Sequence, residues 1–178
     1  MVDCTLPCSF VRLDDAFCRC EVVAVDLLTR LQKYRLICAY RPPNLDNADS
    51  QRLVDCLSSI AGLPNTNTVL AGDFNFPEID WALNVVPVGP SNAFFDWSLS
   101  ESLTQLILEP THVSGNIIDL LLVSEPQNVT NLVIGPPIST SDHYSVEFTL
   151  NAFVTTSRRT VLSYTNLSSL RRYLDEIN

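Results

Sequence analysis

The most informative absence in this sequence is positive charge, because no lysine or arginine occurs anywhere over residues 53–157. The formal net charge is −9, and the basic residues are confined to the two ends of the chain. A free-standing nucleic-acid binder normally presents a basic face, since phosphate contacts supply most of its non-specific affinity. The sequence lacks that feature, so any chemistry on a phosphate would have to rely on a metal ion or a tethered partner.

Long apolar runs are also absent. The run over residues 117–123 is interrupted by Asp119, and none approaches the roughly 18 residues of a membrane-spanning helix. Residues 1–4 lack the basic start and apolar segment of a signal peptide. We therefore expect an intracellular protein, nuclear or cytoplasmic and not secreted, with no membrane partner.

Paired cysteine motifs are missing as well. The six cysteines lie in the first third of the chain, at Cys4, Cys8, Cys18, Cys20, Cys38 and Cys56. The first four could suggest a zinc site, but they do not follow the CxxC pattern and no histidine lies near them. Cys38 and Cys56 fall within apolar patterns typical of small buried residues. Without a secretory signal, we expect reduced thiols.

Length and composition fit one globular domain. The chain has 178 residues, of which 46% are hydrophobic and 17% charged, which favours a substantial core over disorder. We expect an irregular segment over residues 1–19, the folded domain over 20–151 and a linker-like tail over 152–178. The tail is rich in Ser, Thr and Arg, and an amphipathic helix is expected over residues 162–177.

Apolar patterns along the chain predict a layered α/β arrangement. Two β-like runs at residues 20–27 and 34–40 are separated by six residues, which suggests a hairpin. Helices are predicted over about residues 48–60 and after Ser91 and Asn92, which can cap the second helix. Further strands are predicted at residues 68–71, 104–108, 116–123, 128–134 and 144–150. The order strand, helix, strand indicates helices packed on a sheet.

Polar residues follow the strand predicted at residues 68–71. Gly72 can open a sharp turn there, and Asp73 and Asn75 come directly after it. These residue types favour turns for local backbone reasons, so an ordinary turn is one interpretation. The other is a site at the rim of a sheet, where an Asp activates a water or holds a metal and an Asn orients a phosphate or the water. By themselves these residues leave both interpretations open.

Other polar residues stand at the ends of other predicted strands. Asp119 lies in an apolar strand, where an unpaired buried carboxylate would be costly, so the imidazole of His143 is its natural partner. The alternative for Asp119 is a solvent-facing strand edge, and the alternative for Asp142 and His143 is an ordinary loop. Tyr40 taken alone is most often a half-buried strand aromatic. Taken together, such residues indicate a site, because α/β layers build sites at strand ends.

Four motifs occur in the order found in the endonuclease/exonuclease/phosphatase family, which this chain resembles. They are YRPPN at 40–44, GDFN at 72–75, PTH with NIIDLLL at 110–122, and SDH at 141–143. In detail, residues 20–150 resemble the endonuclease domain of LINE-type (non-LTR) retrotransposon polyproteins. The tail looks like the linker that precedes the reverse transcriptase. The resemblance implies a four-layered α/β sandwich and Mg²⁺-dependent phosphodiester hydrolysis, with Mn²⁺ as the alternative cation.

The resemblance also assigns roles to individual residues. Asp73 would orient or deprotonate the attacking water, and Asn75 would help to hold that water or the phosphate. His143 would contact the scissile phosphate, with Asp119 fixing its tautomer and favouring its protonated form. Asp142 would lie beside the metal ion.

Tyr40 would hydrogen-bond the phosphate or the leaving group. Members of the family also carry an Asn motif and a metal-binding Glu well upstream of this Tyr, and only 39 residues precede Tyr40 here. Glu21 lies in the predicted hairpin and is not expected to replace that Glu. We therefore expect the C-terminal portion of the domain, incomplete on its N-terminal side, with doubtful metal binding.

These features leave three interpretations of function. The first is a DNA endonuclease of the retrotransposon type, with DNA as its partner and a reverse transcriptase as its former fusion partner. The second is a catalytically inactive remnant of such a domain that lacks the metal-binding Glu. The third is a phosphatase or phosphodiesterase of the same family that acts on a phosphoinositide or sphingolipid head group.

Overall fold

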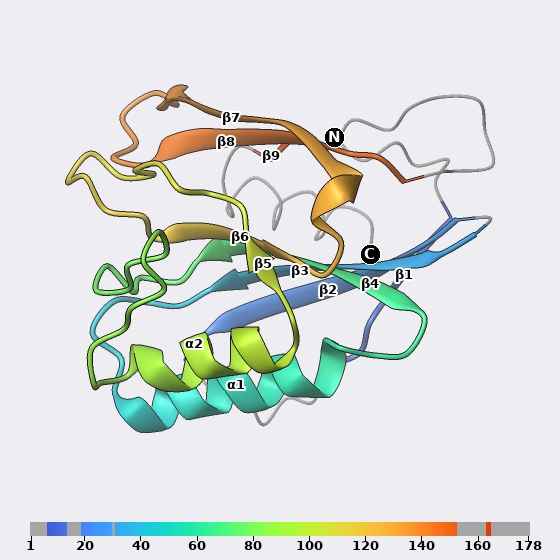
Figure 1. Cartoon of the computed structure of the whole chain (residues 1–178), viewed down its shortest axis with the longest axis horizontal. Helices are drawn as coiled ribbons and strands as arrows, with labels where there is room; N and C mark the ends of the chain where they lie inside the picture. The colour runs from blue at the N-terminus through green and yellow to red at the C-terminus, as the bar shows by residue number, and fades with distance from the viewer. Residues whose placement is uncertain (1–6, 14–18, 30, 153–162, 165–178) are drawn as a thin grey trace.

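The fold is layered, with two helices on one face of a six-stranded sheet and a three-stranded sheet over the other face (Figure 1). The computed structural model describes residues 7–13, 19–29, 31–152 and 163–164. Within these residues the predicted α/β arrangement is confirmed. The described part supplies three layers of the sandwich that the resemblance implies.

The larger sheet has the strand order β1-β2-β3-β4-β6-β5. Its strands are β1 (Cys8–Phe10), β2 (Glu21–Leu28), β3 (Lys33–Tyr40), β4 (Thr66–Asp73), β5 (Thr104–Gln105) and β6 (Asp119–Val123). β2 and β3 form the predicted antiparallel hairpin, whereas β3 and β4 are parallel. A parallel pair needs a crossover, here a helix, and it brings the ends of β3 and β4 to the same edge of the sheet.

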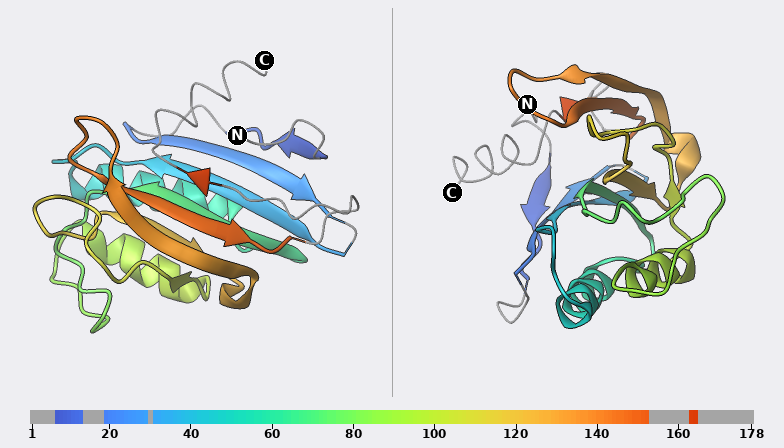
Figure 2. Two further views of the ribbon diagram at one scale, coloured as in Figure 1. Left: turned by 90° about the horizontal axis from the view of Figure 1, so that it is seen from above. Right: turned by 90° about the vertical axis from the view of Figure 1, so that its left-hand side faces the viewer.

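The two helices pack side by side against one face of this sheet (Figures 1 and 2). α1 (Asn47–Ile60) begins after Asp46, whose side chain accepts a hydrogen bond from the backbone N–H of Asp49 at 2.8 Å. This is the capping that a helix start favours, because the first N–H groups have no partner within the helix. No helix in the described part of the chain is both long enough and apolar enough to cross a membrane.

The second helix begins differently from the prediction. α2 (Ser91–Ser100) has Pro90 as its cap residue and no side-chain capping bond. Ser91 is the first helical residue, and Asn92 instead accepts a hydrogen bond from the backbone N–H of Gly89 at 2.7 Å. The prediction of a Ser91–Asn92 cap was therefore wrong by one position.

The smaller sheet consists of β7 (Val129–Pro137), β8 (Tyr144–Leu150) and β9 (Ser163–Tyr164). A short 3₁₀ helix, η1 (Pro126–Asn128), connects β6 to β7. β9 pairs with β8, so two residues of the predicted tail helix are extended instead. The rest of that predicted helix, from residue 165 onward, lies outside the described residues.

Side chains of β6 alternate between two hydrophobic cores. Leu120 and Leu122 belong to the core between the sheet and the helices, whereas Leu121 and Val123 belong to the core between the two sheets. Successive side chains of a strand point to opposite faces. Asp119 therefore shares the face of Leu121 and Val123, which is the face toward the smaller sheet.

The strands predicted at residues 104–108 and 116–123 are shorter in the structure. A loop between β5 and β6 takes up the intervening residues, and His112 in this loop forms an isolated antiparallel bridge with His143. This bridge attaches the loop to the chain just before β8. It brings residues from distant parts of the sequence to the edge where β4 ends.

Candidate active site

The predicted site residues meet where β3 and β4 end and β6 begins, at the left-hand end of the sheet in Figure 1. The right panel of Figure 2 looks onto this end. Tyr40 lies opposite Asp73 in the register of the sheet, and Asp73 lies opposite Asp119. Glu21 continues the row on the far side of Tyr40. Because opposed residues on neighbouring strands share a face, these four side chains start from one face of one edge.

Gly72 allows β3 and β4 to approach closely just before Asp73. A Cβ at Gly72 would lie 1.8 Å from the carbonyl oxygen of Ala39, which no side chain can tolerate. Two residues past Asp73, Asn75 has φ of 49°, a left-handed conformation that Asn adopts more readily than most residues. The two interpretations are therefore compatible, because the turn is what places Asp73 and Asn75 at the rim of the sheet.

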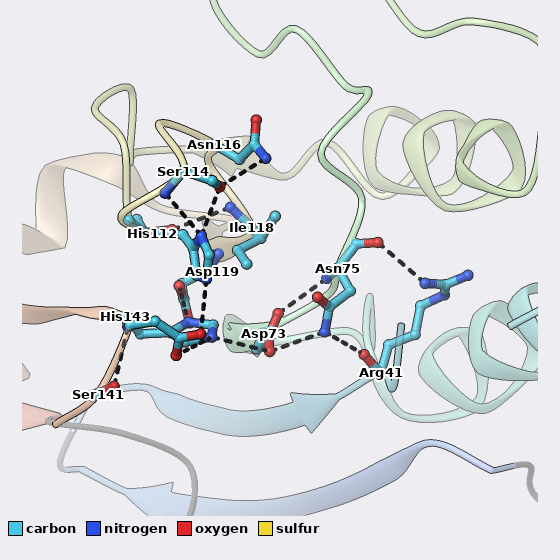
Figure 3. A network of polar contacts seen from close by, with 12 residues as sticks. Arg41, Asp73, Asn75, His112, Ser114, Asn116, Ile118, Asp119, Ser141 and His143 are labelled. Carbon is cyan, nitrogen blue, oxygen red and sulfur yellow. Dashed lines mark hydrogen bonds and ion pairs between the residues drawn. The ribbon is translucent and has the colours of Figure 1, made fainter. Parts of the chain in front are cut away.

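Asn75 holds the carboxylate of Asp73 in one orientation (Figure 3). The backbone N–H of Asn75 donates to Asp73 Oδ1 at 3.1 Å, and Asn75 Nδ2 donates to Asp73 Oδ2 at 3.0 Å. Asn75 Nδ2 also donates to the backbone oxygen of Arg41 at 2.8 Å. Both hydrogens of the Asn75 amide are thus used within the protein, which leaves its Oδ1 as the group that can accept from a ligand.

Arg41 fixes this turn from behind. Its guanidinium is buried and donates to the backbone oxygens of Asn75 at 3.2 Å and Leu45 at 3.0 Å. The guanidinium carbon also lies 4.2 Å from the ring centroid of Phe76, a cation–π contact. Burial lowers the pKa of Arg41, although nearby acidic groups, among them Asp73, oppose that shift. Arg41 is therefore a structural anchor of the turn, and it is not available to a substrate.

Asp119 and His143 form the central pair of the site (Figure 3). His143 Nδ1 lies 2.8 Å from Asp119 Oδ2, the contact that the sequence predicted. The buried hydroxyl of Thr111 accepts hydrogen bonds from the backbone N–H groups of Ile118 at 3.1 Å and Asp119 at 3.0 Å. Thr111 thereby fixes the backbone at the start of β6. The carboxylate of Asp119 is held in place as a result and can orient the imidazole of His143.

The other ring nitrogen of His143 points into a space bordered by acids. His143 Nε2 lies 4.0 Å from Asp73 Oδ2 and 3.9 Å from Asp142 Oδ1. On the far side of Asp142, His112 Nε2 lies 3.2 Å from Asp142 Oδ2. The side chain of Asp142 is 68% exposed, whereas those of Asp73 and Asp119 are 12% and 13% exposed. The site is therefore open to solvent on the Asp142 side.

Burial and mutual charge shift the pKa values of the central groups. Burial raises the pKa of Asp73 to about 6, with a further contribution from the negative charge of Asp119. Burial also raises the pKa of Asp119, although the hydrogen bond from His143 opposes the shift. For His143, burial lowers the pKa, but the hydrogen bond to Asp119 and the surrounding carboxylates outweigh it, so the pKa is raised. All three groups therefore hold their protons to a higher pH than the ordinary side chain does.

Asp142 behaves differently, because the hydrogen bond from His112 lowers the pKa of its carboxyl group. Asp142 is therefore a carboxylate at neutral pH, and it forms a potential metal-binding group with His112 and His143, whose ligand atoms lie within 4.8 Å of one another. Asp142 was predicted to lie beside a metal ion. The structure places it with two imidazoles.

The structure brings together all six residues that the sequence singled out. Asp73, Asn75, Asp119, Asp142 and His143 are joined directly by hydrogen bonds or by contacts of 4.0 Å or less. The half-buried Tyr40 is placed beside them by register.

Three residues around the site, Arg41, Thr111 and His112, were not predicted from the sequence. All three lie within the motifs YRPPN and PTH, so the signal was present but had no assigned role.

Comparison with known proteins identifies relatives of the chain. A family model described as "Endonuclease-reverse transcriptase" matches residues 34–147. A search of curated protein sequences gives no match. Among solved structures, the chain is similar to the "Endonuclease domain of TRAS1, a telomere-specific non-LTR retrotransposon", with a TM-score of 0.58 and 15% identity over 74% of this chain. The chain spans 62% of the length of that domain.

A second solved structure is humanized D. rerio TDP2 carrying 14 mutations, with a TM-score of 0.44 and 10% identity. That match covers 77% of this chain and 65% of the other. At these identities, the likeness to the TRAS1 domain shows the fold of the chain.

Proposed function

We propose, from the premise that this chain belongs to the endonuclease-reverse transcriptase family, that it carries the water-handling and phosphate-contacting side of a cation-dependent DNA endonuclease site. The observation that carries the proposal is the Asp119–His143 pair, whose free nitrogen lies 4.0 Å from the buried carboxylate of Asp73. Phosphodiester hydrolysis needs an aligned water, a neutralised phosphate and a stabilised leaving oxygen. The groups at this edge supply each of these.

Asp73 is the group that orients and deprotonates the attacking water. Its pKa of about 6 leaves it mostly ionised at neutral pH while making it a stronger base than an ordinary carboxylate. Asn75 uses both amide hydrogens on Asp73 and Arg41, so its main role is to position the base. Its Oδ1 can accept one hydrogen from the water.

His143 is the group that contacts the scissile phosphate. Its Nδ1 is committed to Asp119, so Nε2 is the atom that meets the substrate. The raised pKa of His143 favours the imidazolium, which donates a hydrogen bond and places positive charge where the transition state becomes more negative. Tyr40 would hydrogen-bond the phosphate or the leaving oxygen, and the register that sets its backbone opposite Asp73 supports this role.

Oxygen donors at this edge fit a hard divalent cation. Mg²⁺ is commonly held by one or two carboxylates, with water and substrate phosphate completing its shell. Asp142 offers an exposed carboxylate at this edge. It would hold Mg²⁺ or Mn²⁺. Such a cation would neutralise charge on the phosphate, which this acidic chain cannot do with lysines.

DNA is the proposed substrate, and we expect it to bind weakly to this chain alone. Lys33 and Arg35 both pair with Asp26, at 2.9 and 2.7 Å, and Arg41 is buried. Arg52 pairs with the buried Asp49. Most basic side chains that the structure describes are therefore already neutralised, so affinity for DNA should depend on the divalent cation or on a fused partner.

A plasmid-nicking assay tests the proposal. The purified chain, incubated with supercoiled plasmid and Mg²⁺, is expected to nick the DNA, and Asp73→Ala or His143→Ala should each remove that activity. Asp55→Ala, on the exposed face of α1, is the matched control and should keep it. Circular dichroism would verify that all variants are folded.

A second candidate is a domain of the same fold that has lost turnover. The neutralised basic side chains favour it, because they leave little positive charge with which to hold DNA. Folded wild-type protein that fails to nick plasmid at any Mg²⁺ or Mn²⁺ concentration would decide for this candidate. Activity that persists in both Asp73→Ala and His143→Ala would refute the residue roles proposed above.

A further inference from the structure

The structure contains a histidine that the proposed reaction does not use. His112 lies beside the site, with its Nε2 3.2 Å from Asp142 Oδ2. Its ring meets that of His143 edge to face, with centroids 5.0 Å apart. The ligand atoms of His112, Asp142 and His143 all lie within 4.8 Å of one another. Two imidazoles and a carboxylate thus converge on one point that is open to solvent.

The backbone holds the two histidines together. His112 and His143 form an antiparallel bridge, flanked by hydrogen bonds from Tyr144 N–H to the Thr111 oxygen at 2.8 Å and from Val113 N–H to the Asp142 oxygen at 2.9 Å. These bonds flank the bridge, so the two histidines are a non-hydrogen-bonded pair. In such a pair the Cα atoms are closest and the side chains share a face. The imidazoles are therefore brought together by the fold.

Contacts to the Nδ1 atoms leave both Nε2 atoms facing the cluster (Figure 3). His143 Nδ1 is bound to Asp119 at 2.8 Å, the carboxylate contact that metal-binding histidines commonly have. Ser114 meets His112 Nδ1 with its hydroxyl at 2.6 Å and its backbone N–H at 3.1 Å. The Ser114 backbone N–H can only donate, so in the metal-free protein the proton of the neutral His112 ring lies on Nε2. Binding a metal through Nε2 requires the other tautomer, in which Nδ1–H donates to the Ser114 hydroxyl.

We propose that His112, Asp142 and His143 form a binding site for Zn²⁺. Imidazole nitrogens suit Zn²⁺, whereas Mg²⁺ takes oxygen ligands. In a tetrahedral zinc site with bonds of about 2.1 Å, neighbouring ligand atoms lie about 3.4 Å apart. The 3.2 Å between His112 and Asp142 matches that spacing, and the 3.9 Å between His143 and Asp142 needs only a small side-chain movement. Three protein ligands leave the fourth position to water.

Occupation of this site by Zn²⁺ has a consequence that rests on the proposed function. His143 Nε2 is the atom assigned to the scissile phosphate, and Asp142 is assigned to Mg²⁺. Zn²⁺ bound to both would remove them from the reaction. Zn²⁺ therefore acts as an inhibitor of the site, in competition with the activating cation.

Nuclear magnetic resonance of the histidine rings tests the binding directly. The chain has only two histidines, so their ¹⁵N signals are few and can be assigned by substitution. One equivalent of Zn²⁺ added to metal-free protein is expected to shift the Nε2 signals of both. Calorimetry should show that His112→Asn weakens Zn²⁺ binding roughly 100-fold, as expected for the loss of a ligand. Glu109→Gln changes an exposed acid of the same loop and is the control that should not change the affinity.

The possible outcomes distinguish Zn²⁺ bound by the two histidines from Zn²⁺ bound by the cysteines. Zn²⁺ that binds without moving either histidine signal is held by thiols, and this result would overturn the proposal. The same conclusion follows if Zn²⁺ does not bind, or if His112→Asn binds it as tightly as wild type.

The nicking assay then addresses inhibition separately from binding. If Mg²⁺ supports nicking, added Zn²⁺ should inhibit wild type at lower concentrations than it inhibits His112→Asn. Equal sensitivity of the two proteins would refute the inhibitory role. A chain that binds Zn²⁺ through both histidines but never nicks DNA would refute the proposed nuclease function and leave the zinc site established.

Discussion

Burial of the ionised Asp73 carboxylate lowers the free energy of unfolding, so replacing Asp73 with Asn should stabilise the protein. Asp73 is 8% exposed. Burial, together with a smaller contribution from the charge of Asp119, raises its pKa from 3.8 to about 6. A shift of about two pKa units means that the ionised carboxylate disfavours folding by about 3 kcal/mol at pH 8.

Asp73→Asn removes this term but changes one hydrogen bond. The new side-chain oxygen can still accept from the Asn75 backbone N–H, whereas the new amide group cannot accept from Asn75 Nδ2. Losing that bond costs about 1 kcal/mol. The expected net gain at pH 8 is therefore about 2 kcal/mol, or an increase in Tm of about 4–8 °C for a chain of this size.

The stability difference between wild type and Asp73→Asn should depend on pH in a definite direction. The folded state keeps a proton on Asp73 up to about pH 6, whereas the unfolded state loses it near pH 4. Wild-type stability therefore falls as the pH rises through this window, and the advantage of the variant grows over the same range. The raised pKa of His143 also makes stability fall with rising pH. The hydrogen bond to Asp119 that raises this pKa is present in both proteins, whereas the smaller contribution from the charge of Asp73 is lost in the variant.

Thermal unfolding of wild type and Asp73→Asn without divalent cations, from pH 4 to pH 8, measures the effect. Asp55→Asn, an exposed change on α1, is the matched control and should show no pH-dependent difference from wild type. An Asp73→Asn variant whose Tm differs from wild type by the same amount at every pH would refute the reasoning. So would a variant that is less stable than wild type at pH 8.

Two further predictions concern the neighbours of Asp73. Gly72→Ala should destabilise the protein by roughly 3 kcal/mol or more, because the new Cβ would lie 1.8 Å from the Ala39 carbonyl oxygen; urea unfolding measures this, and a near-wild-type midpoint would contradict it. Asp119→Asn should lower the pKa of His143, since it removes the negative charge of Asp119 and leaves only a neutral hydrogen-bond acceptor against the effect of burial. A ¹⁵N titration of the His143 ring checks that shift, and an unchanged pKa would show that Asp119 does not control the imidazole.

Much of the fold follows from local patterns in the sequence. The hairpin of β2 and β3, the helix α1 and the strand β8 lie close to where periodicity predicted them. The signals that predicted these elements, hydrophobic period and turn residues, are carried by neighbouring residues. The start of α2 was misplaced because Ser91 is a strong capping residue by type, yet Pro90 occupies the cap position.

Some of the partners within the site could also be predicted from the sequence. An acid inside the apolar run of β6 needs a partner, and with only two histidines in the chain the choice of His143 for Asp119 was narrow. The Gly-Asp-x-Asn turn could be placed at a strand end for similar local reasons. The roles of these residues as a catalytic set remain predictions that the nicking assay addresses.

Sequence alone thus determined most of the elements, the family motifs and the central acid–imidazole pair. The elements and motifs depend on local pattern, and the pair follows because only two histidines could partner the acid. Only the tertiary structure decided the rest. The register of β2 on β3 carries Glu21 to the edge of the site, and the bridge between distant segments places His112 against Asp142. Arg41 could be read as a surface cation, but the structure buries it behind Asn75. Register and burial depend on contacts between residues far apart in the chain, so no local pattern specifies them.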